Sequence, residues 1–203
     1  MRRLFLCFAA LLALAACGAE PVWAPDEQVA AARYVHEGPK SVTLFTVINN
    51  RNGSGAHSAL LINGSQRVMF DPAGTWHLDK LPERNDVFYG INDKMVNFYI
   101  DYHARKTFRV IEQTVIVPPG VAEAVLQRAL AYGAVPKSQC ASSVTSILRG
   151  VPGFESIKSS MFPKAVMTSF GKLPGVTERT ITGDDADDNH GVLIIQSEDP
   201  LLQ

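Results

Sequence analysis

The chain has 203 residues, 46% of them hydrophobic, with 19 basic against 20 acidic side chains. This length is enough for one domain with a sizeable core, and the charge balance gives no reason to expect a nucleic acid as partner. No phosphate-binding loop, dinucleotide fingerprint or paired-cysteine zinc pattern occurs, so the sequence predicts neither a cofactor nor a metal.

The first segment has the pattern of an export signal. Two arginines precede an apolar run over residues 4–16, which is too short to span a bilayer. Residues 14–17, Leu-Ala-Ala-Cys, resemble the lipobox of bacterial lipoprotein precursors. The resemblance implies a signal peptide over residues 1–16, a bilayer anchor on acylated Cys17 and, because Gly18 follows, a place on the outer membrane facing the periplasm. An ordinary signal peptide with a chance cysteine at its cleavage site is the alternative.

Residues 17–38 are predicted to form a lipidated tether, and residues 39–203 a single domain. β-Branched and apolar runs predict strands at 41–48, 57–62, 67–71, 108–117 and 192–195, and loops at 72–89 and 151–178. Periodicity predicts helices at 93–102, 121–132 and 139–148, and one or two helical turns near 164–170. The expected fold is α+β, an antiparallel sheet of about five strands packed on the helices at 121–132 and 139–148.

Cys140 is the only thiol left in the domain once Cys7 leaves with the signal and Cys17 carries lipid. Exported proteins usually pair their cysteines or dispense with them, so a solitary one is either inertly buried or kept for its reactivity. Its helix is expected to begin here, with Ser138 as N-cap. The unpaired N–H groups of a first helical turn stabilise a thiolate, which makes Cys140 a candidate nucleophile.

A thiol nucleophile needs a base, and the predicted hairpin favours His57. A three-residue loop at 63–65, with Gly64 in a left-handed conformation, would pair His57 directly with Asp71. This register separates polar from apolar side chains on the two faces better than an even loop does. A carboxylate across from His57 could orient the ring and stabilise the imidazolium. The alternative is that Asp71 only opens a turn or pairs with Arg67.

The order of these features resembles a known family. A histidine that opens a strand, a polar residue on the next strand, the helix VAEAVLQRALAY and a late helix-initiating cysteine are similar to the circularly permuted branch of the NlpC-type papain-like superfamily. That branch includes bacterial cell-wall peptidase relatives and lecithin:retinol acyltransferase. The resemblance covers residues 41–150 and implies that Cys140 is the nucleophile, His57 the base and Asp71 the third polar group. The spacing from His57 to Asp71 is longer than the family pattern, whose third residue is often His, Asn or Gln.

The other histidines fit less well. Residues 188–194, DNHGVLI, look like the histidine strand of unpermuted relatives, which makes His190 the main rival. That order requires a multi-stranded sheet after the cysteine, and the proline- and glycine-rich remainder of the chain does not supply one. His77 in a loop is a further alternative, whereas His36 falls in the tether and His103 in a charged stretch.

These features predict a membrane-anchored cysteine hydrolase or acyltransferase. Cys140 would attack an amide or ester carbonyl while His57 takes its proton, and water or another nucleophile would resolve the acyl-enzyme. The location favours amide bonds in peptidoglycan stem peptides, and lipid acyl groups are the second choice. The alternative from another class is a non-catalytic envelope lipoprotein that binds wall peptides or a protein partner.

Overall fold

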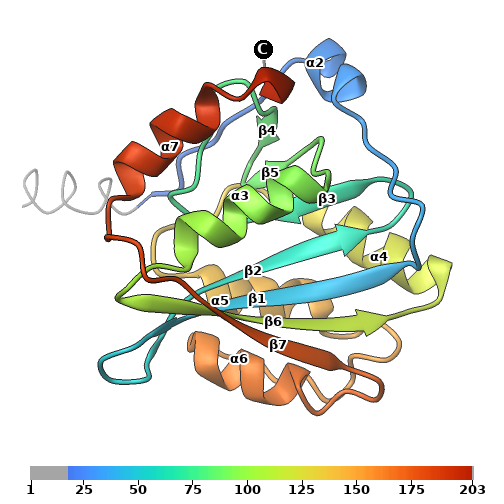
Figure 1. The fold of residues 1–203 in the computed structure, drawn as a ribbon. Helices are drawn as coiled ribbons and strands as arrows, with labels where there is room; N and C mark the ends of the chain where they lie inside the picture. The colour runs from blue at the N-terminus through green and yellow to red at the C-terminus, as the bar shows by residue number, and fades with distance from the viewer. Residues whose placement is uncertain (1–17, 203) are drawn as a thin grey trace, which may run out of the picture.

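The computed structural model describes residues 18–202, so the predicted signal and Cys17 lie outside the described residues. An antiparallel sheet of seven strands forms the centre of the domain, in the order β4-β5-β3-β2-β1-β6-β7 (Figure 1). The strands are β1 (Ser41–Asn49), β2 (Gly55–Asn63), β3 (Arg67–Phe70), β4 (Glu83–Arg84), β5 (Val87–Phe88), β6 (Phe108–Ile116) and β7 (Thr177–Thr182). The α+β class and the antiparallel sheet agree with the sequence prediction, but the sheet has more than the five strands expected.

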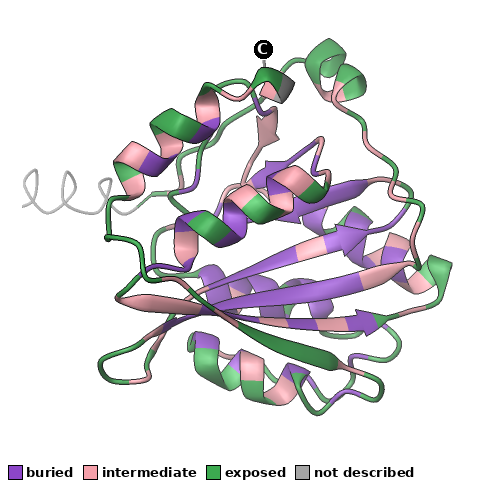
Figure 2. Ribbon diagram, viewed as in Figure 1, coloured by how far each residue is buried: buried purple, intermediate pink, exposed green. Residues whose placement is uncertain are grey.

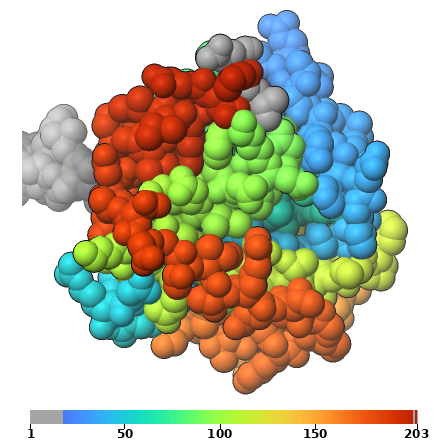
Figure 3. Space-filling model, viewed as in Figure 1, coloured from blue at the N-terminus to red at the C-terminus, as the bar shows by residue number. Residues whose placement is uncertain are grey.

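Helices cover both faces of the sheet. The described part of the chain contains α2 (Asp26–Ala31), α3 (Asp93–His103), α4 (Pro119–Leu130), α5 (Cys140–Leu148), α6 (Pro163–Phe170), α7 (Asn189–Ser197) and a short 3-10 turn (Pro200–Leu202). The helices α4, α5 and α6 pack on one face (Figure 1), and α3 lies on the other with α7 beside it, at the front of the view in Figure 3. No helix within residues 18–202 has the length and apolar character needed to cross a bilayer.

The alternation of side chains along the central strands divides the interior into two cores, and the strands between them are buried (Figure 2). In β2, Leu60 and Ile62 join the core beneath α4 and α5, whereas Ala59 and Leu61 face the core beneath α3. The predicted separation of the two faces of this strand is therefore confirmed.

The hairpin between β2 and β3 has a different register from the one predicted. Asn63 pairs with Arg67, so the loop is 64–66 rather than 63–65, and Asp71 follows β3 instead of pairing directly with His57. The observed register of β2 against β3 differs from the predicted one by two residues. Because side chains alternate between the faces with a period of two, each side chain stays on the face predicted for it. Gly64 is not left-handed as expected. A Cβ there would lie 3.0 Å from Leu126 Cδ2, so the glycine allows the close approach of α4.

Two predictions of local structure are wrong, and one strand was not predicted. Residues 72–89 are not all loop, because β4 and β5 form a hairpin that extends the sheet. The threonine-rich segment at 177–182 forms β7, an exposed edge strand for which the sequence analysis predicted no element beyond the loop that ended at residue 178.

Residues 192–195, expected to form a strand, lie in α7 because Asp188 caps the helix by accepting a hydrogen bond from Gly191 N–H at 3.0 Å. Gln196 then holds α7 against the domain, accepting from Trp76 Nε1 at 3.1 Å and donating to the Phe98 carbonyl at 2.9 Å.

The segment 18–38, predicted to be part of a tether, lies against the domain. The backbone N–H of Ala24 donates to the Glu83 carbonyl at 2.9 Å, and the Arg84 guanidinium lies 4.5 Å from the centre of the Trp23 ring. The segment therefore packs as part of the folded unit and continues the edge of the sheet at β4.

Candidate active site

Cys140 is the first residue of α5 and lies next to β2. The helix is fixed to the sheet by buried side chains on one face, namely Ala141, Val144, Ile147 and Leu148. Gln139 is the N-cap rather than Ser138, which instead takes a left-handed φ of 68° and turns the chain into the helix. The backbone N–H groups of Ser58 and Ala141 lie near the Cys140 sulfur and lower the pKa of its thiol.

His57 lies at the start of β2, opposite Val47 of β1 and beside an irregularity in the pairing of these two strands. Its Nε2 donates to Oδ1 of Asp71 at 2.6 Å, and its ring lies near enough to Cys140 for the two groups to shift each other's pKa. Because Asp71 occupies Nε2, the other ring nitrogen, Nδ1, is the one that can serve the thiol. The structure therefore brings together the three residues that the sequence singled out.

The Asp71 carboxylate is fully buried. Its side chain has no solvent exposure, and Oδ1 accepts a second hydrogen bond from the hydroxyl of Tyr99 in α3 at 2.9 Å. Within residues 18–202, Oδ2 has no hydrogen-bond partner. This oxygen lies close to Gly74, where a Cβ would be only 1.8 Å from it. A buried carboxylate is costly without a cation, so Asp71 depends on His57 being protonated.

Electrostatics favour a charged pair at the site. Burial disfavours the imidazolium, but the charge and hydrogen bond of Asp71, together with those of Cys140, outweigh burial and raise the pKa of His57 to about 10. Burial also raises the pKa of the Cys140 thiol, yet the hydrogen bond and charge of His57 and the N–H groups of Ser58 and Ala141 bring it below its ordinary value. Both shifts stabilise a thiolate beside an imidazolium.

His103 is a second histidine at the site, which sequence reasoning placed only in a charged stretch. Its ring stacks on His57 with 5.8 Å between ring centres, and its Nδ1 donates to the Tyr99 carbonyl at 2.8 Å. Burial, opposed by the charge of Asp71 and reinforced by that of His57, lowers the pKa of His103 to about 4. It is therefore uncharged at neutral pH. His103 directly follows the helix predicted at 93–102, and its spacing of four from Tyr99 was the available signal once that helix is extended by one residue.

A pocket of about 670 Å³ opens beside His57. It is lined by side chains from the sheet, α3 and α7, among them Val47, Tyr102, His103, Arg105 and Leu193. His190, the rival base, belongs to this lining from α7, whereas His77 is half-exposed and lies 3.1 Å from Glu83. Cys140 is 7% exposed and does not line the pocket, so a ligand entering here meets His57 first.

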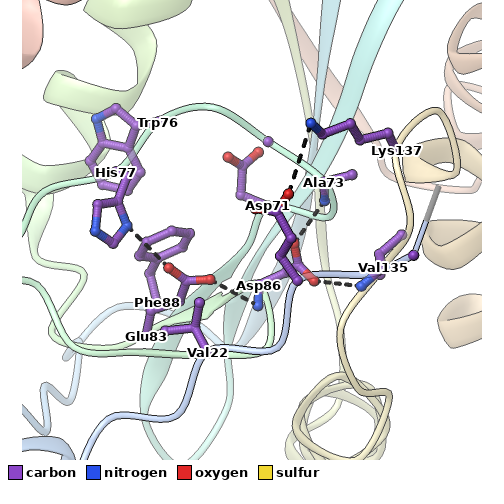
Figure 4. Close-up of a pocket in the computed structure, with 13 residues that line it drawn as sticks. Val22, Asp71, Ala73, Trp76, His77, Glu83, Asp86, Phe88, Val135 and Lys137 are labelled. Carbon is purple, nitrogen blue, oxygen red and sulfur yellow. Dashed lines mark hydrogen bonds and ion pairs between the residues drawn. The ribbon is translucent and has the colours of Figure 1, made fainter. Parts of the chain in front are cut away.

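A smaller pocket of about 220 Å³ lies on the other side of the turn at residues 73–74, which lines both pockets (Figure 4). Carboxylates from Asp71, Glu83 and Asp86 surround it. Within residues 18–202 there is no group of three or more His, Cys, Asp or Glu side chains that could hold a metal ion.

Comparisons with known proteins identify no relative. No family model matches the chain, and neither the curated proteins nor the solved structures contain a significant match. The function therefore has to be derived from the site itself.

Replacing His57 with alanine should make the Cys140 thiol much less reactive toward electrophiles at neutral pH. Without the imidazolium, burial acts on Cys140 with little opposition and its pKa rises above the ordinary value. Each unit of that rise lowers the thiolate fraction about tenfold at neutral pH, so alkylation by iodoacetamide at pH 7 should slow by at least about tenfold. His77→Ala, which removes a histidine ion-paired elsewhere, should react like the parent protein. Equal alkylation rates in His57→Ala and His77→Ala would contradict the assignment of His57 as the residue that activates Cys140.

Gly74→Ala should separate Asp71 from His57. The new Cβ would lie 1.8 Å from Asp71 Oδ2 and 2.4 Å from Asp71 Cγ, both of them side-chain atoms, so the carboxylate has to move. We expect the pKa of His57, followed by NMR titration of its ring, to fall by at least about one unit. The matched control is Gly120→Ala, where the added Cβ meets no atom within 4 Å and the titration should stay unchanged. A His57 pKa equal in the two variants would be evidence against the contact.

Proposed function

We propose that the protein is a membrane-anchored thiol hydrolase or acyltransferase with Cys140 as nucleophile. The observation that carries the proposal is the buried pair of hydrogen bonds that Tyr99 and His57 donate to Asp71, with the His57 ring close enough to Cys140 for each group to shift the pKa of the other. A thiol polarised by a histidine, whose ring is oriented by a carboxylate, is the arrangement that covalent catalysis by cysteine requires.

The chemistry begins from the ion pair. The Cys140 thiolate attacks the carbonyl carbon of an amide or ester, and the electrons of the C=O bond move to its oxygen. When this intermediate collapses, the bond to the amine or alcohol breaks, and that group takes the proton from His57. Water, or an acceptor alcohol or amine, then attacks the thioester, gives its proton to His57 and displaces the thiolate. His57 therefore acts first as an acid, rather than removing a thiol proton during attack as the sequence analysis expected.

The N-terminus of α5 supplies electrostatic support. The positive end of the helix dipole and the N–H groups of its first turn lie at Cys140, so an oxyanion formed there would be stabilised. Ser58 and Ala141 already direct N–H groups at the sulfur and favour the thiolate in the resting state.

The chain order supports the permuted papain-like relationship as part of this proposal. The strand with His57 and the turn with Asp71 precede the cysteine helix in sequence, and α5 packs directly on β2. His190, the base of the unpermuted order, lies on a helix and not on a strand.

For the substrate, we favour amide bonds in wall peptides, with lipid acyl groups second. Acylation of Cys17 would keep the domain at the outer membrane, facing the periplasm, where both occur. The pocket beside His57 offers polar side chains such as His103 and Arg105 together with apolar ones such as Val47 and Leu193, which suits a peptide or an acyl ester.

A non-catalytic envelope lipoprotein that binds wall peptides or a protein partner is the second candidate. One observation favours it: Cys140 is only 7% exposed and does not line the pocket beside His57. In a binding module the Cys140 thiol does not have to reach the ligand. An acyl group trapped on Cys140 would therefore support the enzyme over the binding module.

An activated ester should acylate Cys140. With p-nitrophenyl acetate we expect a burst of one p-nitrophenol per protein and a single acetyl group on Cys140, located by peptide mass spectrometry, because the thiolate is the strongest nucleophile of the site. Cys140→Ala should abolish the burst, whereas Ser146→Ala, an exposed hydroxyl on the same helix, should keep it. An acetyl group on other residues only, or none, would favour the binding module.

The acylation rate should follow a bell-shaped pH profile. It rises with pH through the lowered pKa of Cys140, as the thiolate forms, and falls as pH passes about 10, where His57 loses its proton. Asp71→Asn removes the carboxylate that raises the pKa of His57, so the alkaline limb should move down by about 1–3 units. Stopped-flow acylation rates from pH 4 to pH 11 measure both limbs. If the acylation rate of the parent protein and that of Asp71→Asn fall at the same alkaline pH, Asp71 does not raise the pKa of His57.

A further inference from the structure

We propose that Asp86 is a positioning residue of this site, which fixes the segment that carries Asp71 relative to the segment that leads into Cys140. The inference rests on the proposed function, because it concerns the same thiol. Asp86 does not touch the reacting groups; it acts through the backbone on either side of them.

Asp86 lies at the tip of the hairpin formed by β4 and β5. Arg84 pairs with Val87, which leaves Asn85 and Asp86 as a two-residue turn with φ values of 48° and 66°. Positive φ at both central positions is typical of a type I′ turn, and Asn and Asp are the non-glycine residues best suited to it. The hairpin thus presents the Asp86 side chain at a defined position.

The Asp86 carboxylate joins two segments that are far apart in the sequence (Figure 4). Oδ1 accepts the backbone N–H of Ala73 at 2.8 Å, and Oδ2 accepts the backbone N–H of Val135 at 2.8 Å. The Asp86 backbone carbonyl also accepts the N–H of Asp71 itself, at 2.8 Å. Three hydrogen bonds therefore tie the turn at 71–74 and the stretch before α5 to one residue.

Backbone strain concentrates in the same three segments. Within residues 18–202, four non-glycine residues have positive φ, and all of them lie here: Ala73, Asn85, Asp86 and Ser138. For residues other than glycine, asparagine and aspartate, such as Ala73 and Ser138, this conformation is unfavourable and persists only where the surroundings fix it. Ala73 takes φ 53° and donates to Asp86, while Ser138, with φ 68°, lies between Val135 and Cys140.

Loss of the carboxylate would therefore release both sides of the site at once. The turn with Ala73 could relax from its left-handed conformation and carry Asp71 away from His57. The stretch from Val135 could shift the start of α5. Either movement lengthens the hydrogen bonds on which the imidazolium and the thiolate depend.

The test compares Asp86→Asn with Glu112→Gln. An asparagine at position 86 has one acceptor oxygen, so it cannot receive both N–H groups. We expect the thiol pKa of Cys140 to rise and iodoacetamide alkylation at pH 6 to slow by at least about tenfold, with the acylation kcat falling more than KM changes. Glu112→Gln removes a carboxylate that binds Arg179 at 2.7 Å between β6 and β7, so it should leave both readouts unchanged.

A folded Asp86→Asn protein that is less stable but keeps the parent thiol pKa and kcat would overturn the proposal and leave the proposed function intact. A parent protein without a lowered thiol pKa would instead refute the proposed function. If the variant does not fold, amide exchange in the parent protein decides. The N–H groups of Ala73 and Val135 should exchange slowly, in step with each other, and rapid exchange of either would refute the role of Asp86.

Discussion

The structure depends on one buried contact, the hydrogen bond between His57 and Asp71. A carboxylate without solvent exposure is unfavourable by several kcal/mol unless a cation and hydrogen-bond donors compensate, and here His57 and Tyr99 do so together. Because the thiolate of Cys140 stabilises the same imidazolium, the three groups form one electrostatic unit. Of these three groups His57 is the cation, so removing it leaves the Asp71 carboxylate in the interior without a compensating charge.

The layered fold explains how these groups come together. The helix α5, on one face of the sheet, supplies Cys140, whereas α3, on the opposite face, supplies Tyr99 and His103. His57 lies between them at the start of β2, where helices from both faces reach the same part of the sheet. The site is thus built at the junction of the two cores, and a shift of either layer would alter it.

Part of this arrangement follows from the sequence alone. The period of two along β2 and β3 placed His57 and Asp71 on one face even though the register was off, because an even shift preserves the faces. The extent of the cysteine helix was also predictable, because the structure has it at residues 140–148 where 139–148 was expected, and only the N-cap differs. The permuted papain-like relationship, the lipid anchor and the activity remain proposals.

Other features had no local signal. Strands of two residues such as β4 and β5 carry no measurable periodicity, and the run VLII of α7 fits a strand or a helix until Asp188 is recognised as its cap. Asp86 acts through tertiary contacts with backbone groups of distant segments, which side-chain patterns do not record. The structure and contacts of such residues depend on the tertiary arrangement of the chain and not on local secondary-structure propensity.

Cys140 is the free cysteine of the described residues, and this has a consequence for redox chemistry. A stabilised thiolate is readily oxidised to a sulfenic acid, and within residues 18–202 no second thiol is present to trap that species as an intramolecular disulfide. Recovery then depends on a thiol delivered by another molecule. Small oxidants such as peroxide reach a shielded sulfur more easily than bulky reductants do, so damage would outpace repair in an oxidising compartment.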